Sequence, residues 1–226
     1  MSQLEPKIND FIERLPGALR VIGRALRDWL GEFFLMLVFN VICILCWATI
    51  VLGPPAVAGM YYAVNRTAHA QAIHLRDMYV GARQYFWKAW LLMGLNLLAA
   101  LVFYADMVFF QQYEAGWAVV IQTFVAMTGL LWLATQFYAL PFLMVQKEPR
   151  VFLALRNGLF TLLTSLFYTL VLIAFIGVIL YLVLLRVPPL LLIMPSLIAL
   201  IGTHAVLDRV AYFRSQQAEA IEKDTE

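Results

Sequence analysis

The chain has 226 residues, of which 63% are hydrophobic and only 13% carry a charge. A soluble domain is closer to half apolar and a quarter charged, and it could not bury this much apolar surface in one core. The net charge of +2 at pH 7 gives no reason to expect nucleic acid as a partner. The composition therefore predicts an all-α protein embedded in a lipid bilayer.

The N-terminal segment, residues 1–32, contains a predicted amphipathic helix over residues 18–30. Apolar side chains recur on one face of it at helical spacing: Leu19, Ile22, Leu26 and Trp29. Three arginines lie on another face: Arg20, Arg24 and Arg27. This pattern is typical of a helix lying in the membrane interface. The arginines are a candidate surface for lipid or for a partner, and a simple positive anchor is the alternative.

The first uncharged stretch, residues 33–65, is too long for one crossing, which takes about 20 residues. It is divided by three residues in a row: Gly53, Pro54 and Pro55. Proline ends a helix but suits the first turn of the next one. We expect one helix over residues 33–52 and a second, from 54 towards 72, that either crosses the membrane or forms a short re-entrant segment.

A second amphipathic pattern covers residues 73–88, just before the next apolar stretch. Its basic residues are Arg76, Arg83 and Lys88, and they join the candidate surface for lipid or a partner. Further uncharged stretches follow at 115–146, 157–185 and 187–207, and the stretch that starts at 89 runs to 110 with Asp106 near its far end. Pro141 lies inside one of them and is expected to kink it.

The basic residues define the sidedness of these segments. All but one of the 16 Lys and Arg residues fall in four places: residues 7–27, 66–88, 147–156 and 209–223. Cytoplasmic flanks carry such an excess. The pattern predicts six membrane segments arranged as three hairpins, with a membrane domain over 33–207, a polar tail over 208–226, and both termini in the cytoplasm.

Polar residues inside the spans are the candidate site, because they are costly in a bilayer. The four that suggest a polar pocket for a small solute are Asn40, Asn96, Gln122 and Gln136. Hydrogen bonds that tie helices together are the alternative.

An enzymatic alternative needs three residues to converge: His69, His204 and Asp208. His204 and Asp208 are four residues apart, so they could also pair with each other. The sequence contains no P-loop, zinc-protease or serine-hydrolase motif. The C-x-x-C pair of Cys43 and Cys46 has no second pair of ligands and is expected to pack as small apolar residues. No metal or other cofactor is expected.

The run from Asn40 to Val64 and the residues just after it are similar to the signature of the YesL-like family of small bacterial membrane proteins. The matching positions are Trp47, Gly53, Pro54, Ala56, Ala58, Tyr61, Tyr62 and Arg66. The segments 86–88, 138–141 and 155–159 also resemble the family, so the likeness covers roughly residues 20–205.

The resemblance implies a protein of the bacterial inner membrane that accompanies carbohydrate-uptake transporters, and it brings no catalytic residue. The expected function is therefore that of an accessory or regulatory component of a transport system or larger membrane complex. Its partners would be the lipid bilayer and a membrane protein or a second copy of the chain. A solute-binding carrier is the alternative.

Overall fold

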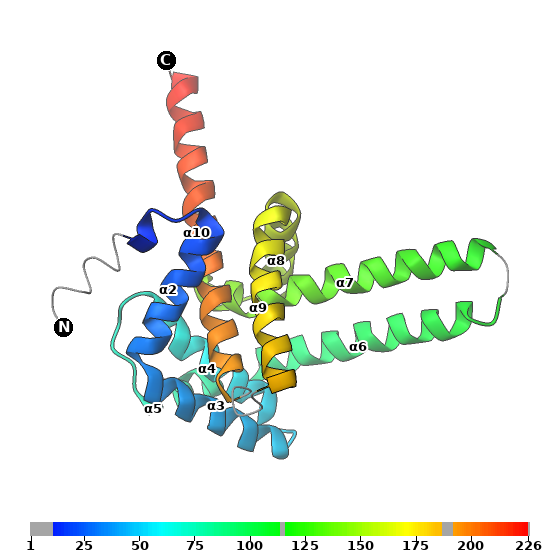
Figure 1. The fold of residues 1–226 in the computed structure, drawn as a ribbon, viewed down its shortest axis with the longest axis horizontal. Coiled ribbons are helices and arrows are strands. Elements are labelled where there is room, and N and C mark those ends of the chain that lie inside the picture. The colour runs from blue at the N-terminus through cyan, green and yellow to red at the C-terminus, as the bar shows by residue number, and fades with distance from the viewer. Residues whose placement is uncertain (1–10, 114–115, 187–191, 226) are drawn as a thin grey trace.

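The computed structural model describes residues 11–113, 116–186 and 192–225, and this part of the chain is helical without any strand. The expected all-α fold is confirmed (Figure 1). The helices are α2 (Gly17–Gly31), α3 (Phe33–Ala48), α4 (Gly53–Ala68), α5 (Leu75–Gln84), α6 (Phe86–Phe110), α7 (Gly116–Val145), α8 (Val151–Thr164), α9 (Leu166–Arg186) and α10 (Met194–Thr225).

Helices α6, α7 and α10 are each long and apolar enough to cross a membrane, which confirms a polytopic helix bundle. Two further pairs of helices are long and apolar enough only when each pair is counted as one span. These pairs are bent where their helices meet, α2–α3 by 91° and α8–α9 by 101°. The described residues thus offer three to five spans, and the count of six membrane segments stays a prediction. Helix α4 has 16 residues and is shorter than a usual crossing, in line with a short second segment.

The stretch 157–185, expected as one span, is divided between α8 and α9 at Ser165. Ser165 has non-helical dihedral angles, φ −130° and ψ 44°. In the preceding turn, the Thr164 hydroxyl donates a 2.8 Å hydrogen bond to the carbonyl oxygen of Phe160. Hydroxyl side chains that bond to the backbone bend helices, so this polar turn ends α8 inside an uncharged run.

The other expected boundaries fall as follows. Helix α3 ends at Ala48, and Pro54 and Pro55 lie in the first turn of α4. Pro141 lies inside α7, which continues to Val145. Helix α10 runs through the expected end of the membrane domain at residue 207 without a break. Residues 1–10 of the N-terminal segment and residues 187–191, at the start of the expected last span, lie outside the described residues.

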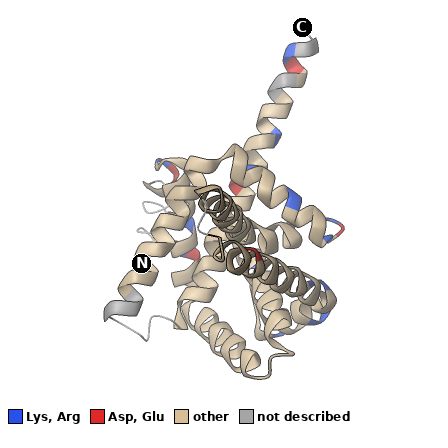
Figure 2. Cartoon of the chain, turned by 90° about the vertical axis from the view of Figure 1, so that its right-hand side faces the viewer, with Lys and Arg blue, Asp and Glu red and all other residues tan. Residues whose placement is uncertain are grey.

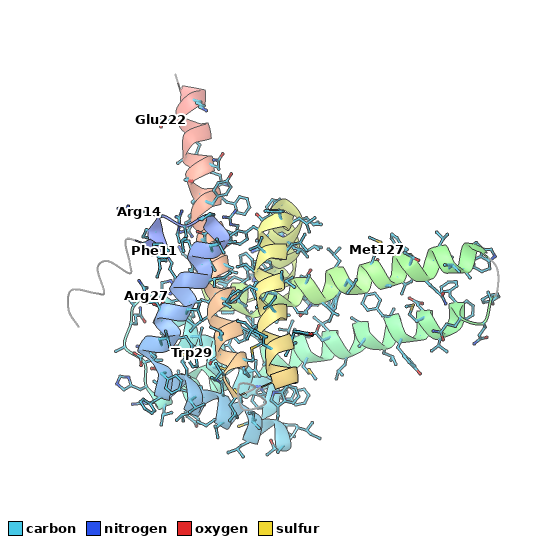
Figure 3. The ribbon with its side chains drawn as sticks, in the orientation of Figure 1. Phe11, Arg14, Arg27, Trp29, Met127 and Glu222 are labelled. Carbon is cyan, nitrogen blue, oxygen red and sulfur yellow. The ribbon has the colours of Figure 1, made fainter. Side chains whose placement is uncertain are left out.

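The core lies where the first half of α10 packs among α2, α3, α4 and α7. More than half of the apolar window of α10 is buried, 56%, against 6% for α6 and 11% for α7. Helices α6 and α7 form a hairpin, here called the α6–α7 hairpin, that projects from this body crosswise to α9 and α10 (Figures 1 and 2). Met127, on α7, is 65% exposed in the hairpin, whereas Trp29 lies inside the body (Figure 3).

Glycines set the closest helix contact in the body, between α4 and α5. A Cβ atom on Gly59 would overlap the carbonyl oxygen of Met78. A Cβ atom on Gly81 would lie 2.5 Å from the Cβ of Tyr62. Because only glycine lets the two backbones approach this closely, α5 is held directly against α4.

Replacing Gly59 or Gly81 by alanine is expected to destabilise the protein by about 1–3 kcal/mol, since the added methyl group must push α5 away from α4. Gly94→Ala is the matched control, because a Cβ atom there meets nothing within 4 Å and alanine favours a helix. Thermal unfolding of the detergent-solubilised variants measures the difference. Equal melting temperatures for all three variants would contradict the close contact.

Candidate functional site

The four polar residues predicted to share a pocket are found in three separate places. Asn96 and Gln136 meet between α6 and α7. Asn40 is bonded to the start of α10. Gln122 lies near the start of α7 and does not line the hollow that holds Asn96 and Gln136. The polar pocket is thus reduced to one pair, and a third side chain joins it.

A polar triad of Asn96, Trp132 and Gln136 connects α6 to α7. The Asn96 amide donates to the Gln136 side-chain oxygen at 3.2 Å, and the Trp132 indole donates to the Asn96 side-chain oxygen at 3.0 Å. The Gln136 amide donates to the backbone carbonyl of Trp132 at 3.4 Å. These groups are only half-buried, so part of their hydrogen-bonding capacity faces outward.

The triad closes one end of a hollow of about 830 Å³ between the two helices, here called the hairpin hollow. The rest of its wall is almost wholly apolar: Leu97, Ala100, Phe103, Tyr104, Met107, Val125, Ala126, Gly129, Leu130 and Leu133. Asn96 lies ten residues into α6, roughly 15 Å along its axis. In a helix that crosses about 30 Å of hydrocarbon, this depth is near the middle.

A second polar cluster joins α2, α3 and α10, and we call it the Ser196 network: Trp29, Asn40 and Ser196. The backbone N–H of Ser196 donates to the Asn40 side-chain oxygen at 2.9 Å. The Ser196 hydroxyl accepts hydrogen bonds from the Asn40 amide at 2.8 Å and from the Trp29 indole at 2.9 Å. Asn40 and Ser196 are fully buried.

The Ser196 network satisfies a need that α10 cannot meet by itself. The first N–H groups of a helix have no partner inside that helix. Ser196 is the third residue of α10, and Asn40 supplies its missing acceptor from α3. Asn40 therefore has a structural role here. Its partner Ser196 was not among the residues predicted from the sequence, because nothing in the residues around Ser196 distinguishes it.

The three residues proposed for an enzymatic site each interact with a different residue and do not form hydrogen bonds with one another. His204 pairs with Asp28 of α2 at 2.9 Å, not with Asp208. Asp208 pairs with Arg209 at 2.7 Å. His69, just after α4, is exposed, and its ring contacts the carbonyl oxygen of Asn65 in the last turn of that helix at 2.7 Å. Among the described residues, no three His, Cys, Asp or Glu side chains are grouped as a metal site would require.

The carboxylate of Asp28 is held in its ionised form by two neighbours. Burial alone would raise its pKa, but hydrogen bonds from His204 and Arg27 outweigh that effect, so the pKa of Asp28 lies below its ordinary value. The pair joins the end of α2 to α10 about two turns beyond Ser196. Asp28 and His204 therefore fasten α2 to α10 a second time.

The predicted basic surface divides into three parts. On α2, Arg24 and Arg27 form ion pairs with Glu13 and Asp28, each at 2.7 Å, and Arg20 donates to the carbonyl of Leu15. On α5, Arg76 and Arg83 are exposed. Lys88 lies apart from them, over the ring of Tyr85, in a crevice that it shares with Arg150 and Arg156. The α2 arginines are thus bonded to other residues of the chain, whereas those of α5 face outward.

Comparisons with protein-family models, with curated proteins and with solved structures found no match for this chain. The resemblance to the YesL-like family therefore stays a prediction from the sequence.

The lowered pKa of Asp28 makes a prediction about pH. Asp28→Asn is expected to cost about 1–2 kcal/mol near pH 7, because the charge-assisted hydrogen bonds weaken. A free aspartate has a pKa of about 3.9. The stability that Asp28 adds relative to asparagine is therefore complete well above that pH and is lost as the pH falls below it. Melting temperatures of both proteins from pH 7 to pH 3 measure this.

The matched control for that series is Glu148→Gln, which removes an exposed ion pair with Arg150. It should leave stability nearly unchanged, since exposed pairs contribute little. A gap between wild type and Asp28→Asn that stays constant down to pH 3 would contradict the role of the Asp28 charge.

Proposed function

We propose that the protein is a non-enzymatic accessory or regulatory subunit of a larger membrane assembly, and that a transmembrane helix of the partner packs into the hairpin hollow. The resemblance to the YesL-like family favours a carbohydrate-uptake system as that assembly. The observation that carries the proposal is the polar triad at one end of an otherwise apolar, uncovered hairpin.

Lipid alone is a poor cover for this hollow. Acyl chains offer no hydrogen bonds, and polar groups left facing hydrocarbon cost free energy. Asn96 and Gln136 retain donors and acceptors beyond those used within the triad. A partner helix brings both an apolar surface for the long walls and polar side chains or close backbone for the triad.

The charges of the chain support one orientation of the hairpin. No Lys or Arg occurs between residues 89 and 146, whereas Lys88 precedes this stretch and Lys147 and Arg150 follow it. In Figure 2 the hairpin points toward the viewer, and its near end is drawn without blue residues. By the positive-inside rule, the base of the hairpin lies at the cytoplasmic side of a bacterial inner membrane. Both termini would lie on that side too.

A solute-binding carrier is the second candidate function, and it rests on the same hollow. Its volume of about 830 Å³ is within the range of ligand sites, and Asn96 and Gln136 converge at one end. Against it, the other two residues predicted for such a pocket, Asn40 and Gln122, lie outside the hollow. The partner-helix proposal needs only the residues that the hollow contains.

Photo-crosslinking in the native membrane tests the proposal. A crosslinking amino acid in place of Leu130, which lines the hollow and is 67% exposed, should give an adduct with one membrane protein. Val178 of α9 is the control position, because it is 58% exposed but does not line the hollow. It should give mainly lipid adducts. Mass spectrometry identifies both.

Combining Leu130 crosslinking with Asn96→Leu and Gln136→Leu should abolish the protein adduct, whereas Gln122→Leu should not. If Leu130 reacts only with lipid, no helix fills the hollow and the proposal fails. An adduct of two copies of this chain would replace the accessory role by a homo-oligomer. A small molecule retained by the wild type and lost with Asn96→Leu and Gln136→Leu would favour the carrier.

A further inference from the structure

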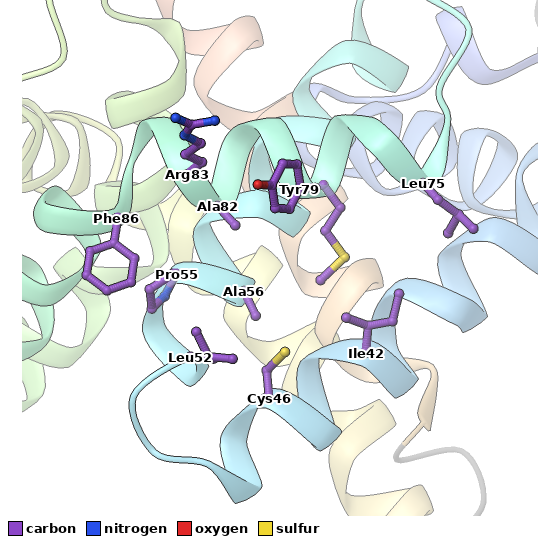
Figure 4. Close-up of a pocket in the computed structure, with 11 residues that line it drawn as sticks. Ile42, Cys46, Leu52, Pro55, Ala56, Leu75, Tyr79, Ala82, Arg83 and Phe86 are labelled. Carbon is purple, nitrogen blue, oxygen red and sulfur yellow. The ribbon is translucent and has the colours of Figure 1, made fainter.

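A second cavity lies beside α5, and we call it the α5 cavity. It shares no lining residue with the hairpin hollow. It is a partly open space of about 500 Å³ between α5, the end of α3 and the start of α4 (Figure 4). Its wall is almost entirely apolar, with Ile42, Leu52, Pro55, Met78, Ala82 and Phe86 among its residues. A cavity of this size and lining suits a hydrocarbon chain.

The α5 cavity opens beside a polar hollow on the outer side of α5. Tyr79 and Arg83 line both spaces. Arg76, Val80 and Gln84 complete the lining of the outer one, which measures about 470 Å³. In Figure 4 the Arg83 guanidinium and Ile42 lie on opposite sides of α5, and the Tyr79 ring lies between them in this view. The two spaces thus share Tyr79 and Arg83 as lining residues, which places the apolar space next to a pair of arginines.

The two arginines are both exposed and face outward together. They are seven residues apart, which places them two turns apart on the same face of α5. The acid nearest to them in sequence, Asp77, is already bonded to Arg66 at 2.7 Å and to the backbone N–H of His74 at 2.8 Å. Within the described residues, neither Arg76 nor Arg83 has an acidic partner, so the pair can bind an anion.

The site lies at the level expected for lipid headgroups. Helix α6 begins at Phe86, directly after α5, and Trp87 in its first turn is 81% exposed. Exposed tryptophan beside a lysine is typical of the membrane interface, and the uncharged part of α6 begins at residue 89. From these flanking residues we infer that Arg76 and Arg83 lie at the level of the phosphate groups, with the cavity towards the hydrocarbon.

We propose that this site binds one anionic phospholipid of the bilayer, with an acyl chain in the α5 cavity and the headgroup phosphate at Arg76 and Arg83. The glycine contact between α4 and α5 holds the wall of the site in place. This inference goes beyond the proposed function, because it concerns a different face of the protein and does not require a partner helix in the hairpin hollow.

Native mass spectrometry of the full-length protein in mild detergent tests the site. The protein is titrated with phosphatidylglycerol or with phosphatidylcholine, whose headgroups differ in net charge. The wild type is expected to retain one phosphatidylglycerol about tenfold more strongly than phosphatidylcholine, since each arginine near a phosphate contributes to binding. Glycerol phosphate, which has the headgroup chemistry but no chain, should not displace the lipid.

Two variants separate the parts of the site. Arg76→Gln with Arg83→Gln should abolish the preference for the anionic lipid, and Cys46→Phe should weaken retention of both lipids by filling the cavity. Arg214→Gln with Lys223→Gln is the control, because it removes two positive charges from the exposed part of α10. It should bind like the wild type. Gel filtration of each variant confirms that it is folded.

Three results would overturn the proposal. The first is equal retention of the two lipids by the wild type. The second is an equal loss for the Arg214 and Arg76 double variants, which would reduce the effect to net charge. The third is displacement of the bound lipid by glycerol phosphate or by a polypeptide that copurifies, which would make the site one for a free anion or a protein.

Discussion

The Ser196 network is the interaction on which the body of this protein depends. In a bilayer, polar groups must find their partners within the protein, because hydrocarbon supplies none. Here the buried amide of Asn40 and the indole of Trp29 both bond to Ser196, at the start of α10. These three residues come from α2, α3 and α10, so the network fixes the 91° bend between α2 and α3 against the central helix.

The rest of the molecule is arranged around that fixed centre. The pair of Asp28 and His204 fastens α2 to α10 at a second level, and the contact of Gly59 with Gly81 fastens α5 to α4. Against this well-connected body, the α6–α7 hairpin stands out because its surface is largely uncovered. An uncovered hairpin on a well-connected body fits the proposed role of an assembly subunit, since the surface offered to a partner is then held in place before binding.

The helices could be predicted from the sequence, because long uncharged runs and the prolines at 54 and 55 carry local information about where helices lie. The partners of the polar residues could not. Asn40 bonds to Ser196, 156 residues away, and His204 bonds to Asp28 instead of the nearby Asp208. Such choices depend on tertiary packing. The bend at Ser165 was missed for a different reason, since a single hydroxyl-rich turn does not interrupt an apolar run.

A double-mutant cycle on Asn40 and Ser196 tests the central claim most directly. Ser196→Ala should cost about 1–3 kcal/mol, because it removes the acceptor of the buried Trp29 indole and the nearer acceptor of the buried Asn40 amide. The exposed Ser215→Ala is the control and should cost almost nothing. With Asn40→Ala already present, Ser196→Ala should cost clearly less, giving a coupling energy above about 0.5 kcal/mol from unfolding in detergent. Strictly additive effects, or equal effects of Ser196→Ala and Ser215→Ala, would contradict the account.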